Sequence, residues 1–159
     1  MGLLETIFIG TSLAMDAFTV SVCKGLSMKK MSWKKAGIIA MYFGFFQMFM
    51  PIVGYIVGTS FSDLIEKIDH WIVFILLVFI GGKMIKESFD KEESINDKID
   101  FNTMIILALA TSIDALAIGI TYAFLEAQNV MISFSLIGFI TFFISLLGVK
   151  IGNTFGRKI

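Results

Sequence analysis

Five apolar runs of about membrane-spanning length dominate this chain of 159 residues. They cover residues 3–23, 36–59, 70–87, 102–125 and 130–153. A helix that crosses a bilayer needs about 20 predominantly apolar residues, and each run comes close to that length. With 57% hydrophobic residues, a water-soluble domain of this size could not bury so much apolar surface. The sequence therefore predicts an all-α polytopic membrane protein with five transmembrane helices in one domain, residues 1–159.

Two of these runs carry an aspartate near their middle. Asp16 lies in the segment 14–20 of the first run, and Asp114 lies in the similar segment 112–118 of the fourth. Translocon-based insertion scales give a cost of about 2.5–3.5 kcal/mol for one aspartate at the centre of a membrane helix. Two such aspartates in similar segments predict one shared site, and the expected cargo of a buried acidic pair is a cation.

A second similarity links the second and fifth runs. Three glycines followed by a phenylalanine recur with the same spacing. The second run contains Gly44, Gly54 and Gly58 and is followed by Phe61, and the fifth contains Gly138, Gly148 and Gly152 and is followed by Phe155. The aspartate segments are offset by 98 residues and the glycines by 94. Because three crossings separate the two units, they have opposite directions in the membrane, an architecture common among transporters. We predict two inverted three-helix repeats, with repeat one at 1–89, a cytoplasmic loop at 90–100 and an incomplete repeat two at 101–159.

The second repeat lacks a counterpart of the helix at 70–87, so a sixth helix is expected and missing. Without it, one flank of the helix at 130–153 should meet lipid or a neighbouring molecule. Residues on that flank are Phe134, Ile137, Phe142 and Gly148. The sequence therefore predicts either a homodimer that covers this flank or a truncated form of a longer chain.

The basic residues predict the orientation. Twelve of the 13 lysines and arginines flank the same side of the predicted helices, and Lys67 alone falls on the other side. Loops rich in lysine and arginine stay in the cytoplasm. We therefore expect the N-terminus on the outer side of the membrane and the end of the fifth helix on the cytoplasmic side.

Oxygen-bearing side chains accompany the two aspartates. Ser12 and Thr111 lie four and three residues before Asp16 and Asp114, respectively, on the same helix faces. Gln47 lies near the centre of the second run, and Pro51 deprives its backbone carbonyl of a helical partner. Thr141 is the repeat counterpart of Gln47. The candidate metal ligands are therefore Asp16, Asp114, Gln47, Ser12, Thr111 and Thr141.

Such an all-oxygen set with two negative charges suits a hard divalent cation such as manganese or magnesium. The apolar runs lack histidine apart from His70 at a boundary, and the single cysteine lies near a helix end, which argues against zinc or copper. Alternatives remain open for each residue. The aspartates and Gln47 can serve as hydrogen-bonding partners between helices, and the hydroxyls can bond back to their own backbone.

Several motifs in order resemble one known family. They are Met15-Asp16-Ala17-Phe18 followed by Lys24-Gly25, Pro51-Ile52-Val53-Gly54, His70-Trp71-Ile72 with Gly81-Gly82-Lys83-Met84-Ile85, and Ala110-Thr111-Ser112-Ile113-Asp114-Ala115. Over nearly its whole length the chain resembles the MntP manganese efflux pumps of bacteria, which belong to a superfamily that includes lysine exporters. The resemblance implies six helices in the complete protein, export of manganese(II), and functional roles for Asp16 and Asp114.

The expected function is thus that of a secondary transporter and not of an enzyme. Its expected partners are a divalent metal ion as transported substrate and the lipid bilayer, with no separate cofactor and no nucleic acid. Two rival hypotheses remain: an exporter of another cationic solute such as lysine, and a non-transporting membrane scaffold in which the aspartates join helices.

Overall fold

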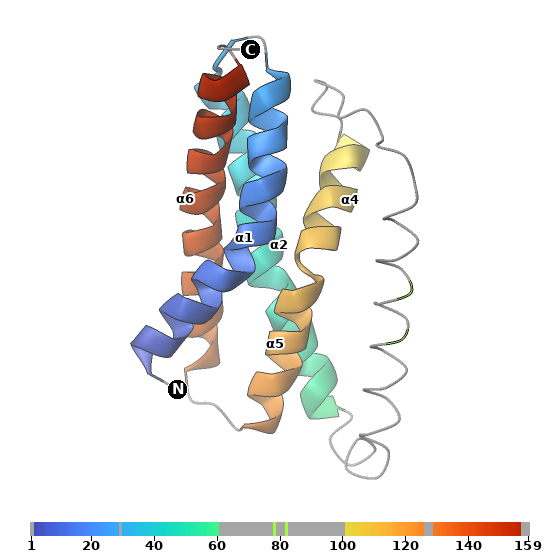
Figure 1. Cartoon of the computed structure of the whole chain (residues 1–159). Helices are drawn as coiled ribbons and strands as arrows, with labels where there is room; N and C mark the ends of the chain where they lie inside the picture. Colours follow the sequence, from blue (N-terminus) through green and yellow to red (C-terminus); the bar gives the residue numbers. More distant parts are fainter. Residues whose placement is uncertain are drawn as a thin grey trace.

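The computed structural model describes residues 2–28, 30–60, 78, 82, 101–125 and 129–156. The helices in this part of the chain are α1 (Leu3–Ser27), α2 (Trp33–Ser60), α4 (Phe101–Thr111), α5 (Ile113–Phe124) and α6 (Val130–Gly156), shown in Figure 1. The helix expected at 70–87 and the loop expected at 90–100 lie outside the described residues, apart from Val78 and Gly82.

The helices have the length and composition of membrane spans. α1, α2 and α6 are each long and apolar enough to cross a bilayer, and α4 and α5 together make a fourth candidate span. This confirms the predicted class of an all-α polytopic membrane protein.

The single helix predicted at 102–125 is wrong in one respect, because the chain bends by 45° between α4 and α5. Ser112, at the break, has φ −107° and ψ 4°, outside the helical range. Just before it, the Thr111 hydroxyl donates to the carbonyls of Leu107 and Ala108, both at 3.1 Å. A threonine hydroxyl that bonds back to the preceding turn often bends a helix. The segment contains neither Gly nor Pro at this point, so no ordinary helix-breaking signal marked the position.

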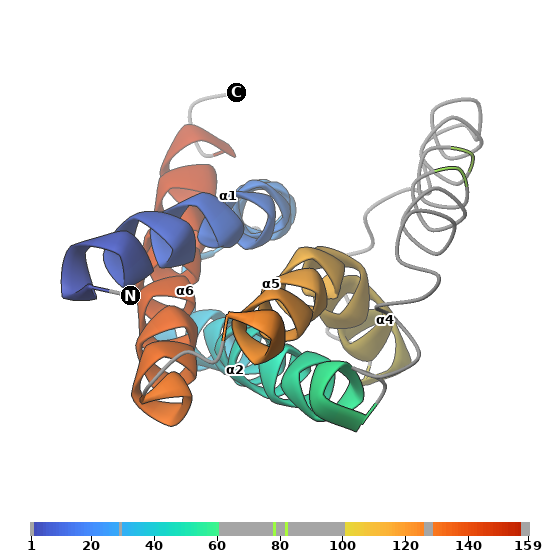
Figure 2. The same ribbon diagram turned by 90° about the horizontal axis from the view of Figure 1, so that it is seen from below.

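The helix directions of the first half, α1 and α2, are reversed in the second half, where α4 and α5 precede α6. α1 and α6 run toward one end of the molecule, whereas α2, α4 and α5 run toward the other (Figure 1). α1 packs mainly against α6, and α2 packs against both α5 and α6, while the consecutive helices α1 and α2 touch only slightly. The packing order α1, α6, α2, α5 can be followed in Figure 2. Each half therefore completes its packing with a helix of the other half.

Glycines make the same close contact twice. A Cβ atom on Gly54 of α2 would collide with the carbonyl of Leu116 in α5. A Cβ atom on Gly148 of α6 would lie 2.9 Å from the carbonyl of Phe18 in α1. Gly148 is the repeat counterpart of Gly54, 94 residues later, and Phe18 is the counterpart of Leu116, 98 residues earlier. Small residues let membrane helices approach backbone to backbone. The repeated contact supports the predicted inverted repeats.

The two repeats meet at Gly44 and Gly138, which are themselves repeat-related. A Cβ on Gly44 would lie 3.0 Å from the Gly138 carbonyl, and one on Gly138 would lie 2.9 Å from the Gly44 carbonyl. This contact maps onto itself when the repeats are exchanged, so the pseudo-twofold axis passes here. An apolar groove of about 420 Å³ lies over it, lined by four repeat-related pairs: Met41 and Ser135, Gly44 and Gly138, Phe45 and Phe139, and Met48 and Phe142.

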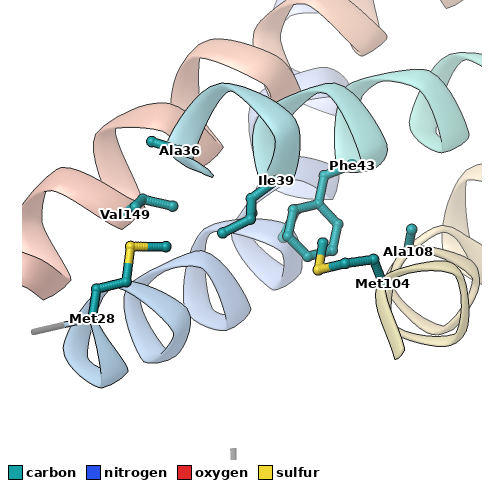
Figure 3. Packing of buried hydrophobic residues seen from close by; sticks show 8 residues of the cluster. Met28, Ala36, Ile39, Phe43, Met104, Ala108 and Val149 are labelled. Carbon is teal, nitrogen blue, oxygen red and sulfur yellow. The ribbon is translucent and has the colours of Figure 1, made fainter. Parts of the chain in front are cut away.

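Two apolar clusters occupy the two ends of the bundle. One joins α1, α2, α4 and α6 and includes Ile39, Phe43, Met104 and Val149 (Figure 3). The other joins α5 and α6 through Tyr122, Phe134 and Ile137, with Ile9 and Leu13 of α1 and Ile52 and Tyr55 of α2 packed against it. The middle of the bundle lies between these clusters.

The prediction that one flank of the last helix would be exposed is wrong for three of its four residues. Phe134 and Ile137 are 1% and 0% exposed, and Gly148 is buried against α1, whereas Phe142 is partly exposed. α6 is central because it packs on both α1 and α2. Burial of this flank removes the reason for expecting a homodimer through it.

We expect Gly152→Ala to destabilise the protein, because the added Cβ would collide with the Val22 carbonyl of α1. Overpacking of this kind lowers the free energy of unfolding by about 1–3 kcal/mol. Gly37→Ala is the matched control, since a Cβ at Gly37 of α2 meets nothing within 4 Å. Thermal unfolding in detergent would measure both. Equal melting temperatures for the two variants would contradict the proposed backbone contact.

Candidate functional site

Asp16 lies near the middle of α1, on a face that the other described helices leave open. Its neighbours Ala14 and Ala17 are fully buried, whereas Asp16 and Ser12 are exposed. The buried alanines belong to the side of α1 that packs against the rest of the bundle, so the carboxylate points away from that contact. Ser12, one turn earlier, shares its face, as the spacing predicted.

Asp114 lies in the first turn of α5, directly after the break at Ser112. Its side chain is exposed, and Ala115 beside it is buried. The first turn of a helix carries backbone N–H groups without helical partners and a partial positive charge, which favours a carboxylate there. Interrupted helices of this kind form the ion and substrate sites of many transporters.

The two carboxylates come from opposite repeats and lie close enough for electrostatic repulsion between them. They are repeat-related, since Asp114 follows Asp16 by 98 residues. The fold therefore brings together the two aspartates that the sequence analysis assigned to one site, and a cation between them would relieve their repulsion.

Gln47 lies fully buried on α2 and connects the two aspartate-bearing segments. Its Nε2 donates to the carbonyl of Leu13 in α1 at 3.2 Å. Its Oε1 accepts from the Oγ of Ser112, at the break before α5, at 3.0 Å. Because each amide atom already has a partner, Gln47 holds helices together whatever else it contacts.

Ser112 is not among the metal ligands predicted from the sequence. The available signal was a serine two residues before Asp114 in an apolar run, which by itself does not distinguish a functional hydroxyl from one bonded to its own backbone. Only the fold brings its Oγ to Gln47.

The two threonines of the candidate set differ. The Thr111 hydroxyl donates to its own helix, as the structural alternative predicted, and its lone pairs remain as acceptors. Thr141 is fully buried on α6, and its hydroxyl has no hydrogen-bond partner in the described part of the chain. The structure thus brings Asp16 and Asp114 together, connects both segments to Gln47, and leaves Thr141 on α6 with an unused polar atom.

Among the residues that the structure describes, the charged ligands assigned to the site are Asp16 and Asp114. Within residues 2–28, 30–60, 101–125 and 129–156, no group of three or more His, Cys, Asp and Glu side chains comes together. A cation held by Asp16 and Asp114 would complete its coordination with neutral oxygens from hydroxyls, amides, carbonyls or water, which is the chemistry of hard divalent cations.

If the two carboxylates lie this close, cysteines at the two aspartate positions should be joined by a short bifunctional reagent. The variant is Asp16→Cys with Asp114→Cys in a Cys23→Ser background, with a protease site inserted within 90–100. After cleavage at that site, only cross-linked halves stay together on a denaturing gel. Asp16→Cys with Thr121→Cys is the control, because Thr121 lies two turns along α5, about 10 Å further. Equal linkage of both pairs, or linkage of the control pair alone, would contradict the proximity of Asp16 and Asp114.

Comparison with known proteins gives one consistent family. A family described as "Mntp: Putative manganese efflux pump" matches residues 30–159. Three relatives carry the name "Putative manganese efflux pump MntP". The protein of Desulfitobacterium hafniense is 54% identical over 99% of this chain and 83% of its own length. That of Acetivibrio thermocellus is 51% identical over 99% and 80%, and that of Campylobacter jejuni 50% identical over 98% and 84%. No solved structure matches the chain.

Proposed function

Because the chain belongs to the family of manganese efflux pumps, we propose that it exports manganese(II) from the cytoplasm through a site between α1 and α5. The observation that carries this proposal is the pair of carboxylates, one from each repeat, that lie close enough to repel each other near the middle of the helix bundle. Each carboxylate is costly at bilayer depth, and their mutual repulsion adds to that cost. A divalent cation between them compensates both charges.

The proposed coordination is made of oxygen atoms alone. Asp16 and Asp114 supply the charge, and Ser12 lies one turn from Asp16 on the same face. Neutral oxygens of Gln47, Thr111 and Thr141 complete the proposed set. Gln47 and Thr111 keep acceptor lone pairs beyond their printed hydrogen bonds, and Thr141 has an unpartnered hydroxyl among the described residues.

The distribution of lysines supports a cytoplasmic origin of the cargo. The described lysines gather at the end of the bundle where α1 and α6 finish and α2 begins: Lys24, Lys30, Lys34, Lys35 and Lys150. Lys150 of α6 lies 5.9 Å over the Trp33 ring at the start of α2, so these segments share one end. By the positive-inside rule this end is cytoplasmic, and the N-terminus lies outside the plasma membrane.

Transport would proceed by alternating access. The two apolar clusters close the bundle on either side of the aspartates, one at the lysine-rich end and one at the opposite end. Loosening each cluster in turn would open the site to one side. Moving a divalent cation out against an inside-negative potential costs about 2.3 kcal/mol per charge per 100 mV. Inward proton movement on the same aspartates would supply this energy.

We expect Asp16→Asn and Asp114→Asn each to lower manganese uptake into everted membrane vesicles by at least about tenfold, a loss of ~1.4 kcal/mol in transition-state stabilisation. Asparagine keeps the shape and hydrogen bonding of the side chain and removes the charge that binds the cation. Glu5→Gln is the control, an exposed acid on α1 whose carboxylate accepts from the Gly2 N–H at 3.0 Å.

The same variants separate the rival functions. A scaffold should tolerate both asparagine substitutions, since the amide still hydrogen-bonds. An exporter of lysine or another cationic solute should lose transport of that solute, and a strain lacking the protein should then be sensitive to lysine-containing peptides and not to manganese. Either result would contradict manganese export.

We also expect selectivity for manganese over magnesium and calcium to be incomplete. All three are hard cations that accept oxygen ligands, and nitrogen or sulfur ligands that would favour a transition metal are lacking in the proposed set. Excess magnesium or calcium should therefore reduce manganese uptake in vesicles partly. Uptake of magnesium at the same rate as manganese would count against manganese as the physiological cargo.

A further inference from the structure

We propose that Ser112 is a positioning residue of the cation site, acting through Gln47 to fix the helix break that places Asp114 opposite Asp16. This inference rests on the proposed function and extends it to a residue that does not itself contact the cation. It concerns a chain of two hydrogen bonds, from Ser112 to Gln47 and from Gln47 to the Leu13 carbonyl, here called the polar link.

The polar link joins the two segments that carry the charges. Leu13 lies three residues before Asp16 in α1, and Ser112 lies two residues before Asp114. α1 has only slight packing against α4, so few apolar contacts set the distance between these segments. Gln47 and Ser112 are both 0% exposed, which shields their hydrogen bond from competing water. One buried side chain of α2 thus holds both aspartate-bearing segments.

The Ser112 hydroxyl is used differently from most hydroxyls in the described helices. The others typically donate to a carbonyl one turn earlier in their own helix, as do Thr11, Thr19, Thr121, Ser135 and Thr154. Ser112 precedes α5 in the capping position, where a serine oxygen usually accepts a backbone N–H of the first turn. It makes no such cap and donates across the bundle to Gln47. The break at Ser112 is therefore secured by a tertiary contact.

The other repeat lacks this link. The counterparts of Gln47 and Ser112 are Thr141 and Ala14, and the Thr141 hydroxyl has no partner among the described residues. Ala14 has no hydroxyl to donate. Helix packing is repeated on both sides of the pseudo-twofold axis, yet the polar link occurs on one side. The fold alone does not require it, which points to a role in the site.

Loss of the Ser112 hydroxyl should weaken cation binding more than it changes the turnover rate. Without the hydroxyl, Oε1 of Gln47 loses its buried donor, the break is held less firmly, and Asp114 samples positions away from Asp16. Loss of residues that orient metal ligands typically reduces affinity by 10–100-fold. We expect Ser112→Ala to raise the manganese concentration for half-maximal uptake by about tenfold.

The experiment measures initial manganese uptake against manganese concentration in everted vesicles for Ser112→Ala, Ser112→Thr, Gln47→Leu and the Ser112→Ala/Gln47→Leu double variant. Ser112→Thr keeps the hydroxyl and should restore near-normal half-saturation. The half-saturating manganese concentration of the double variant should be no higher than that of the more impaired single variant, because both substitutions break the same link. Thr121→Ala is the matched control on α5, since its exposed hydroxyl donates only to the Ala117 carbonyl of its own helix.

Half-saturation in Ser112→Ala equal to that in Thr121→Ala would overturn the inference, as would fully multiplicative losses in the double variant. A lower melting temperature without a change in half-saturation would show a structural role only, and would overturn it too. If Gln47→Leu fails to fold, the comparison of Ser112→Ala with Ser112→Thr decides alone. A folded wild-type protein that takes up no manganese would overturn the proposed function and this inference together, whereas normal wild-type uptake with a normal Ser112→Ala would overturn the inference alone.

Discussion

Backbone-to-backbone contact at glycines holds the helices of opposite repeats together. In a bilayer, burial of apolar side chains between helices gains little, because lipid tails are as apolar as leucine, so close packing takes over. Gly54 meets α5 and Gly148 meets α1, while Gly44 and Gly138 meet each other on the pseudo-twofold axis. The order of the described helices follows from these contacts, and the most extensive packing joins helices that are not consecutive in the sequence.

That arrangement determines where charge can be placed. α1 uses its alanine face for packing, which leaves Asp16 on the open face, and the break before α5 places Asp114 in a helix first turn on the opposite side. Exchange of the repeats maps one aspartate onto the other. A site near such an axis belongs equally to both repeats, which is what alternating access requires of a midplane site.

The polar link departs from this symmetry. Gln47 reaches the Leu13 carbonyl and the Ser112 hydroxyl on one side, whereas the shorter Thr141 on the other side reaches neither type of partner among the described residues. A buried amide with both ends paired restricts the relative movement of α1 and α5 more than apolar contacts would. The two openings of the proposed transport cycle therefore need not be equally easy, since one of them moves segments that Gln47 joins.

The sequence by itself determined the class of protein, and it predicted the inverted repeats and the two aspartates of the candidate site. Each of these depends on local composition or on spacing: apolar runs of bilayer length, an isolated acid within such a run, and two glycine patterns offset by 94 residues. The tertiary structure alone decided which helices pack together, that α6 is buried on the flank containing Phe134 and Ile137, and that the helix at 102–125 breaks at Ser112. The reason is physical: a serine in an apolar segment is compatible with a straight helix. Its hydroxyl turns away from the local backbone because the buried amide oxygen of Gln47, 65 residues away in the sequence, accepts its hydrogen bond.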